Sequence, residues 1–353
     1  MPNRINSPAD SLSAWMQHYQ QLAVVSVRSP AVADKIALHL ERFCHFFGEI
    51  YGHERISTCL KRDVLTWQTA LREQGLAPAT VNNHLASLSA FTTWVNSQAP
   101  RLFAGGDPAK GIGELALPPL EPRALTQRQI ATLKNLCDRL EQFYRRKGRR
   151  WANRDEAPPL RTDARPRRDR AIIFVLLSTG LRREELVQLN LEQLNPCTPS
   201  ELRKAKRSRI DHVQGKRKTE RVVFLSVDAR NALADYLEYE RRQDTFGEAT
   251  QPLFLSAACI AKREADGRLS PRAINYILDQ IGRWHDAELG DPERHISPLR
   301  PHDLRHTFAF QLARITGADA YELERRLGHR SQRYIQRYTN PPEEVAASYV
   351  ETF

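Results

Sequence analysis

Cysteine and long apolar runs are scarce in this chain of 353 residues. Its five cysteines lie far apart without metal-ligand spacing, and their number is odd. We interpret them as reduced thiols of a cytosolic protein rather than as a disulfide framework. The longest apolar run, 171–177, is far too short to cross a bilayer, and the N-terminus lacks an apolar signal core. A soluble intracellular protein without a membrane partner is therefore expected.

Two patterns that support common enzyme chemistry are also missing. The sequence has no glycine-rich phosphate loop followed by Lys and Ser or Thr, which would indicate a nucleotide site. It has no cluster of carboxylates at metal-binding spacing either. We therefore predict neither a cofactor nor a metal site.

Basic residues, in contrast, are abundant and concentrated. Lys and Arg number 53 against 42 Asp and Glu, which gives a net charge of +11 and an isoelectric point near 9.6. Residues 141–170 carry eleven basic and five acidic side chains, and residues 201–221 carry nine and three. Such concentration suits a surface that follows phosphates and favours a nucleic acid as partner. Total charge alone is equally consistent with a basic protein that needs charge for solubility.

The length favours two domains, and the pattern of the chain suggests where they meet. Residues 11–96 have apolar positions at helical spacing and few strand signals. Glycine and proline then become dense between residues 100 and 122. We predict a helical domain over 1–106, a linker over 107–122 and a second domain over 123–353.

One helix of the first part has a polar face of interest. It is predicted to begin near Pro78, and its apolar stripe leaves Asn82, Asn83 and His84 pointing elsewhere. These three side chains are candidates for DNA contact. The alternative is an ordinary solvated helix face.

The second part is predicted to be mainly helical with a small sheet. Residues 126–144 have a helical pattern, whereas the basic, proline-containing stretch 145–168 indicates an exposed insertion that either grips DNA or is merely solvated. The run 171–177 is a buried helix or a strand, since periodicity does not separate the two. Residues 208–213 and 221–225 predict an antiparallel hairpin with a basic tip.

A first motif with possible chemistry spans residues 301–306, Pro-His-Asp-Leu-Arg-His. Pro301 suits a first helical turn, and His302 and Arg305, three residues apart, share one helical face. An opposite stripe is predicted to be buried. It consists of Leu304, Phe308, Leu312 and Ile315. The motif alone is also consistent with two solvated surface side chains.

The second motif is Leu-Gly-His at 327–329, followed nine residues after His329 by Tyr338. The segment 179–186, Thr-Gly-Leu-Arg-Arg-Glu-Glu-Leu, lies upstream of both motifs. In this order and spacing, the three motifs resemble those of the tyrosine site-specific recombinases, the phage integrase and Xer family. The resemblance extends from about Leu12 to Tyr338, although only the motifs are close.

The resemblance implies a full set of site residues. The catalytic positions are Arg182, Lys216, His302, Arg305, His329 and the nucleophile Tyr338. Glu185 corresponds to an acidic position that braces the site. Spacing from His329 favours Tyr338 over Tyr334 as nucleophile.

The reaction of this family explains why these residue types are needed. Cleavage of a phosphodiester builds charge on the non-bridging oxygens, and the guanidiniums of Arg182 and Arg305 can clamp them at any working pH. A phenol with a pKa of about 10 needs its proton removed as it attacks. We assign His302 to that role for Tyr338.

The departing 5′ oxygen needs a proton, which an ammonium on a mobile hairpin can supply. The resemblance puts this general acid on Lys216 and leaves His329 to hydrogen-bond the phosphate. Many relatives have glycine where this chain has Arg217, so Lys218 remains a second candidate for the acid. Arg217 and Lys218 are also candidates for DNA contact.

For the whole molecule, the resemblance implies a mainly α protein that closes on double-stranded DNA as a C-shaped clamp. A helical, SAM-like core-binding domain would precede a mixed α/β catalytic domain with a small antiparallel sheet. A monomer would assemble into a tetramer on two paired recombination sites, through an exchanged tail at 343–353. The expected location is the cytoplasm, with action at the nucleoid.

The resemblance leaves the biological task open among integration, excision, resolution and transposition. A type IB topoisomerase or a telomere resolvase would share the same residues. A catalytically retired recombinase would act only as a sequence-specific DNA-binding protein. The complete catalytic set argues against retirement, because binding alone needs no nucleophile.

Overall fold

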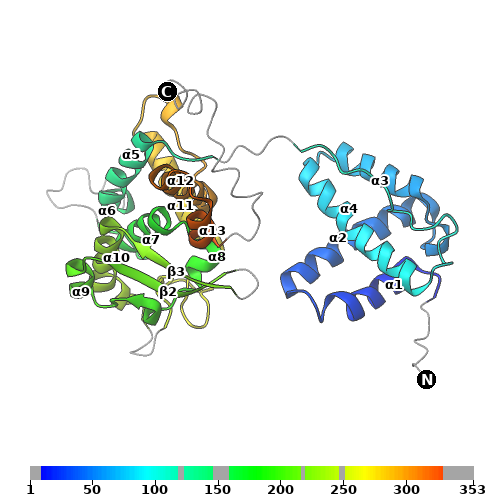
Figure 1. Cartoon of the computed structure of the whole chain (residues 1–353), viewed down its shortest axis with the longest axis horizontal. Coiled ribbons are helices and arrows are strands. Elements are labelled where there is room, and N and C mark those ends of the chain that lie inside the picture. Colours follow the sequence, from blue (N-terminus) through cyan, green and yellow to red (C-terminus); the bar gives the residue numbers. More distant parts are fainter. Residues whose placement is uncertain (1–8, 118–122, 146–158, 216–218, 246–250, 329–353) are drawn as a thin grey trace. The chain divides into compact units, whose positions relative to one another are not determined.

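The computed structural model describes residues 9–117, 123–145, 159–215, 219–245 and 251–328 (Figure 1). The chain divides into two compact units, residues 1–120 and 121–353. The first consists of helices, and the second combines helices with one small antiparallel sheet. The predicted fold class, mainly α with a small antiparallel sheet in the second part, is confirmed.

Four α-helices build the first unit. They are α1 (Leu12–Tyr19), α2 (Pro30–Tyr51), α3 (Lys61–Glu73) and α4 (Pro78–Gln98), with a short π-helix η1 (Gln20–Val24) and a 3-10 turn η2 (Ile56–Thr58). Proline opens α2 and α4, where its missing N–H has no intrahelical partner to lose. Their apolar faces meet in an aromatic core around Phe43, Phe47, Trp67 and Phe91. The predicted start of a helix at Pro78 is confirmed.

Residues 107–117, assigned from the sequence to a linker, pack along the first unit. The Asn82 amide clamps this segment, because its Nδ2 donates to the Leu115 carbonyl and its Oδ1 accepts from the Leu115 N–H, both at 2.9 Å. Gln68 Nε2 donates to the Gly113 carbonyl at 3.1 Å, and Ala109 is buried. The first unit thus extends beyond residue 106.

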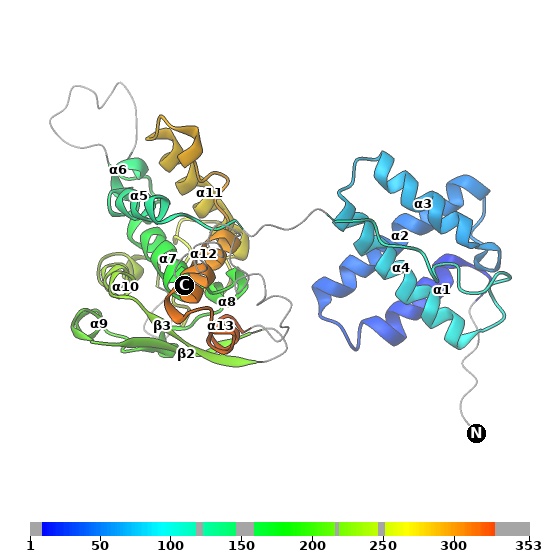
Figure 2. The same ribbon diagram turned by 45° about the horizontal axis from the view of Figure 1, so that its top comes forward.

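The second unit is built around one buried helix. Its α-helices are α5 (Gln127–Asp138), α6 (Leu140–Tyr144), α7 (Pro166–Thr179), α8 (Arg183–Val187), α9 (Pro199–Lys204), α10 (Val227–Tyr239), α11 (Pro271–Ala287), α12 (Pro301–Thr316) and α13 (Ala320–Leu327). Three 3-10 turns, η4 (Leu191–Gln193), η5 (Arg241–Asp244) and η6 (Pro292–Arg294), connect them. The run 171–177 belongs to α7, which packs against α5, α6, α10, α12 and β3 (Figure 2).

The sheet has three antiparallel strands in the order β1 (Leu194–Asn195), β2 (Ser208–Gln214) and β3 (Glu220–Leu225). Ile210 pairs with Val223 and Val213 with Arg221, and a register shift between these pairs accommodates His212 at a φ of 51°. The predicted hairpin is confirmed. Its tip, 216–218, lies outside the described residues.

One prediction for α12 of the second unit is corrected. Ile315 is 82% exposed, so the predicted buried stripe of α12 is wrong at that position. The helix turns Ala309 and Ala313 instead toward Leu323 and Leu327 of α13, because α13 packs on that side.

Among the described residues, no helix has the length and hydropathy of a membrane span.

In the described part of the 145–168 stretch, residues 161–163 are exposed, as expected, but two arginines that follow them are buried. Arg165 is buried and forms a two-point ion pair with Asp244, both bonds 2.6 Å long. Arg168 is buried too, where it contacts Asp169 and the Leu255 carbonyl. These two arginines are used inside the unit, because buried carboxylates need cationic partners.

Candidate active site

Four of the site residues predicted for the second unit are described, and they come from two helix starts. Arg182 and Glu185 belong to the start of α8, and His302 and Arg305 to the start of α12. The remaining predicted site residues lie outside the described residues. They are Lys216, Arg217, Lys218, His329 and Tyr338.

A sharp turn between α7 and α8 positions Arg182. Gly180 ends α7 in the left-handed region at a φ of +60°, and a β-carbon at this position would overlap the Phe308 ring. Glycine alone meets both demands without strain. Arg182 then caps α8, and its backbone N–H donates to Glu185 Oε2 at 2.8 Å.

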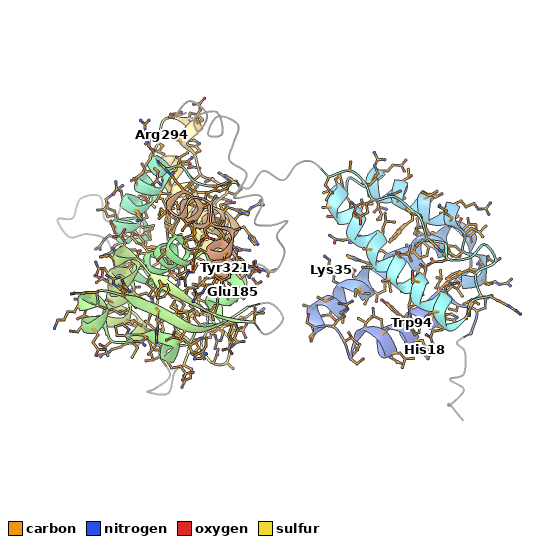
Figure 3. All side chains as sticks on the ribbon, in the orientation of Figure 1. His18, Lys35, Trp94, Glu185, Arg294 and Tyr321 are labelled. Carbon is orange, nitrogen blue, oxygen red and sulfur yellow. The ribbon has the colours of Figure 1, made fainter. Side chains whose placement is uncertain are left out.

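Glu185, which is labelled in Figure 3, is a buried carboxylate. It holds two arginines. Its Oε1 accepts from Arg182 Nη1 at 2.8 Å, and Arg221 donates to both of its oxygens at 3.1 and 2.6 Å. Burial acts to raise the pKa of Glu185, but its bonds and charge interactions with Arg221 and Arg182 prevail and lower the pKa to about 2. Glu185 is therefore ionised at any working pH and can brace Arg182.

Arg221 is the residue that sequence reasoning missed. Besides its two bonds to Glu185, its Nε donates to the backbone carbonyl of Arg326 at 3.0 Å. Its only distinction in the sequence is that it closes the basic segment 201–221, where it is one of nine basic residues. The contacts of its guanidinium, rather than any motif, single it out.

Arg305 is buried at the first turns of α12. Pro301 opens this helix, and Asp303 caps it by accepting from the Arg300 N–H at 2.9 Å. Arg305 Nη1 donates to the Gly180 carbonyl and Nη2 to the Leu327 carbonyl, both at 2.6 Å. Arg305 thus links the turn before Arg182 to the end of α13.

His302 lies exposed on the first turn of α12, with its ring centroid 6.2 Å from that of His306. Partial desolvation lowers the pKa of His302, and the positive charges of Arg305 and Arg182 lower it further. His302 is therefore neutral near pH 7 and able to accept a proton.

In the first unit, two of the three candidates for DNA contact are buried. Asn82 binds the Leu115 backbone, as described above. His84 Nδ1 bonds the Thr80 carbonyl at 2.8 Å, and its Nε2 lies 3.1 Å from Arg42 Nη1. Only Asn83 is exposed, so it alone remains a candidate for DNA contact.

No metal centre is found among the residues that the structure describes. No three His, Cys, Asp or Glu side chains of those residues are grouped to hold an ion. The cations of the described site are guanidiniums. Their donors are directed at Glu185 and at the ends of α7 and α13.

Comparison with known proteins gives one consistent result. The family model described as the phage integrase family matches residues 154–344. A tyrosine recombinase XerC of Roseiflexus castenholzii is 29% identical over 306 residues, which cover 85% of this chain and 80% of that protein. A XerC of Pelobacter propionicus is 35% identical over 173 residues, 49% of this chain and 47% of that protein.

Solved structures resemble the fold at low sequence identity. The XerH site-specific recombinase bound to palindromic difH substrate, a post-cleavage complex, matches with a TM-score of 0.65 at 17% identity, covering 99% of this chain and 98% of that one. The Tn1549 transposon integrase in complex with a circular intermediate DNA gives a TM-score of 0.65 at 17% identity, with 98% and 99% covered.

Proposed function

The chain belongs to the phage integrase family, and from this premise we propose that it is a site-specific DNA recombinase that cuts and rejoins strands through a 3′-phosphotyrosyl intermediate. The relatives at 29% and 35% identity are named tyrosine recombinases, which supports the proposal. Its substrate is double-stranded DNA that carries specific recombination sites. The task among integration, excision, resolution and transposition follows from the position of those sites.

The proposed reaction exchanges one phosphodiester for another. The Tyr338 oxygen bonds to phosphorus as the bond from phosphorus to the 5′ oxygen breaks. His302 takes the phenolic proton, and Lys216 donates a proton to the departing 5′ oxygen. A 5′-hydroxyl of another strand then attacks the phosphotyrosine and reverses these steps. The energy of the bond is retained, so the reaction needs neither ATP nor a metal ion.

One observation carries this proposal: Arg305, on the first turns of α12 with His302, binds the turn that precedes Arg182. Arg182 and Arg305 both lower the pKa of His302, and Arg305 binds the Gly180 carbonyl two residues before Arg182. A scissile phosphate held by the two arginines would therefore lie near a base that is free to accept a proton. A protein that only bound DNA would need the positive charges but not the neutral imidazole.

The remaining roles extend the same proposal. His329 hydrogen-bonds the phosphate, and Glu185 braces Arg182. Asn83, Arg217 and Lys218 contact DNA outside the reacting phosphate. The first unit, up to residue 117, acts as the core-binding domain, and the second, from residue 123, acts as the catalytic domain. The monomer assembles into a tetramer on paired sites, in the cytoplasm at the nucleoid.

The direct test maps covalent attachment. Purified protein is incubated with fragments of DNA from its own genomic neighbourhood, denatured, and the fragments that stay attached to protein are sequenced. We expect one defined attachment sequence, attachment that persists in excess EDTA without nucleotide, and complete loss of attachment in Tyr338→Phe. DNA binding by Tyr338→Phe should be unchanged, because the substitution removes a single oxygen.

Tyr334→Phe is the matched control and should retain attachment. If Tyr338→Phe still forms the adduct and Tyr334→Phe does not, the nucleophile is misassigned. Strict dependence on magnesium would contradict the proposed chemistry. Attachment without sequence preference, together with relaxation of supercoils, would indicate a type IB topoisomerase instead.

A further inference from the structure

We propose that Arg221 is a positioning residue of the strand-cleavage reaction, which couples the orientation of Arg182 to the docking of α13. The proposal rests on the proposed function, because it concerns the same phosphate-binding arginine. Arg221 has no contact with the reacting atoms in this view. It acts through Glu185 on one side and through the backbone at the end of α13 on the other.

The first step of the argument is the way Arg221 uses its guanidinium. Two nitrogens bind the two oxygens of Glu185, and the third binds the Arg326 carbonyl. The side chains of Arg221 and Glu185 are 8% and 5% exposed. Lysine can replace this guanidinium only in part, because it offers a single charged point, whereas the planar arginine binds a carboxylate on one edge and a carbonyl on another.

The second step concerns the end of α13. This helix ends at Leu327, so its last carbonyls have no intrahelical donors and carry the negative end of the helix dipole. Arg221 takes the carbonyl of Arg326, and Arg305 takes the next one, that of Leu327. Two arginines thereby fix the end of α13 directly before residue 329, where the segment with the predicted His329 and Tyr338 begins.

Gly328 makes this close approach possible. It caps α13 in the left-handed region at a φ of +63°, and a β-carbon there would lie 3.1 Å from Arg221 Nη1. Any larger residue would strain the backbone at this φ and would force the Arg221 guanidinium to shift by a few tenths of an ångström. The glycine of the 327–329 motif therefore serves the contact with Arg221 as well as the helix cap.

The third step is the balance of charge around Glu185. Its buried carboxylate is shared between Arg182 and Arg221, and the Arg182 side chain remains 27% exposed. Without Arg221, Arg182 would be the sole strong cationic partner of a buried anion. The carboxylate would then draw Arg182 inward and away from a phosphate on the surface. Arg221 thus keeps Arg182 available by satisfying the second half of Glu185.

Arg221 also ties this arrangement to the hairpin. It is the second residue of β3 and pairs with Val213 of β2, in the two strands that flank the tip with Lys216. Phe224 of the same strand lies under the Arg326 guanidinium, 4.8 Å from ring centroid to Cζ. Strand β3 therefore contacts α13 at two points, and Arg221 alone extends the contact to Glu185.

The test compares Arg221→Met and Arg221→Lys with Arg165→Met, whose side chain forms an equally buried two-point pair with Asp244. Single-turnover cleavage is measured on a nicked duplex of the mapped attachment site, alongside equilibrium binding and melting temperature. We expect Arg221→Met to cleave roughly 100-fold more slowly while its Kd changes less than about 3-fold, because misplacing a positioning group costs about this much. Arg221→Lys should be intermediate.

A second substrate separates positioning from stability. In a duplex with a neutral methylphosphonate at the scissile position, Arg182 has less negative charge to balance. If Arg221 acts through Arg182, the deficit of Arg221→Met should shrink from roughly 100-fold to below about 10-fold on this substrate. A deficit that comes from instability alone would be the same on both substrates and would appear in Arg165→Met as well.

Each result decides the matter. Wild-type cleavage by Arg221→Met, equal losses in Arg221→Met and Arg165→Met, or an unchanged deficit on the methylphosphonate would overturn the positioning role. If Arg221→Met does not fold, Arg221→Lys takes its place, because it keeps a cation beside the Glu185 carboxylate, and it should show the same pattern with a smaller deficit. Wild-type protein that forms no covalent adduct would overturn the proposed function itself.

Discussion

The protonation of His302 sets the pH dependence expected at the scale of single residues. A general base works in its neutral form, and its pKa lies below 6.5 because of desolvation and the charges of Arg305 and Arg182. The cleavage rate at subsaturating DNA should therefore rise with pH through a value below 6.5 and level off before neutrality. Single-turnover cleavage rates measured between pH 4.5 and 8 test this rise.

The control for this pH dependence removes one of the two positive charges that lower the pKa of His302. Arg182→Gln should shift the rise in cleavage rate to higher pH, because the loss of a positive charge raises the pKa of His302. The overall rate should fall at every pH, since the phosphate clamp is incomplete. If the cleavage rate of His302→Gln still rises over the same pH range, another group is the base.

Sequence motifs predicted Arg182, Glu185, His302 and Arg305 as site residues. In the structure Arg182 binds Glu185, and Arg305 of the same helix as His302 binds the turn before Arg182. Arg221 was not identified, because a single arginine in a basic segment has no local signature. Its importance arises from contacts 36 and 105 residues away in the chain, with Glu185 and Arg326. Pattern analysis along the sequence does not register such contacts.

The polar face of α4 illustrates the opposite failure. Asn82 and His84 lie off the apolar stripe, so the sequence indicated a surface that could touch DNA. The segment 107–117 covers Asn82, and Arg42 of α2 binds His84. Whether a polar residue is solvated depends on what packs over it, and the periodicity of its own helix contains no information on that.

At the scale of elements, the run 171–177 shows why burial hides secondary structure. Helix α7 is covered from several sides by α5, α10, α12 and β3, so its run 171–177 is apolar on every face. A continuous apolar run has no period to distinguish a helix from a strand. The hairpin, in contrast, was predicted correctly because strand-like residues flank a basic turn on both sides.

The hairpin carries the prediction for the general acid. Lys216→Ala should be slowed by about 100-fold or more on normal DNA, the usual contribution of a positioned acid. Sulfur is a far better leaving group than oxygen and needs no proton. On a duplex with a 5′-bridging phosphorothioate the variant should therefore cleave at nearly the wild-type rate, as measured by denaturing gel electrophoresis.

Lys218→Ala is the matched control, because Lys218 stands two residues along the same hairpin tip. Lys218→Ala should cleave normal DNA well. Its cleavage rate should not be specifically increased on the duplex with the 5′-bridging phosphorothioate. Rescue of Lys218→Ala instead would transfer the role of the acid to Lys218. Rescue of neither variant would mean that the proton comes from outside the hairpin.

At the scale of the whole molecule, the sequence evidence for two units came from amino-acid composition rather than from hydrophobic periodicity. Glycine and proline between residues 100 and 122 indicated where helical structure stops. Residues 107–117 nevertheless pack on the first unit through backbone contacts with Asn82 and Gln68. An irregular segment can pack as firmly as a helix, and its sequence does not predict this.

Assembly on DNA is the last property for which the sequence makes a prediction, in the tail at 343–353. Glu343 and Glu344 suit the first turn of a helix, where they favour its dipole. An apolar stripe follows, formed by Val345, Tyr349, Val350 and Phe353. Eleven residues are too few for a stable isolated helix, so the stripe must dock on a protein surface to be ordered.

That surface belongs either to the same catalytic domain or to a neighbouring protomer. In the second case, the tail of each subunit would dock on the next subunit around a cyclic tetramer. We predict this arrangement. Deleting residues 343–353 should then leave the affinity for a single site nearly unchanged in mobility-shift assays. Synapsis of paired sites and strand exchange should be abolished. A truncated protein that recombines at the normal rate, or one that unfolds because the tail completes its own core, would contradict exchange between subunits.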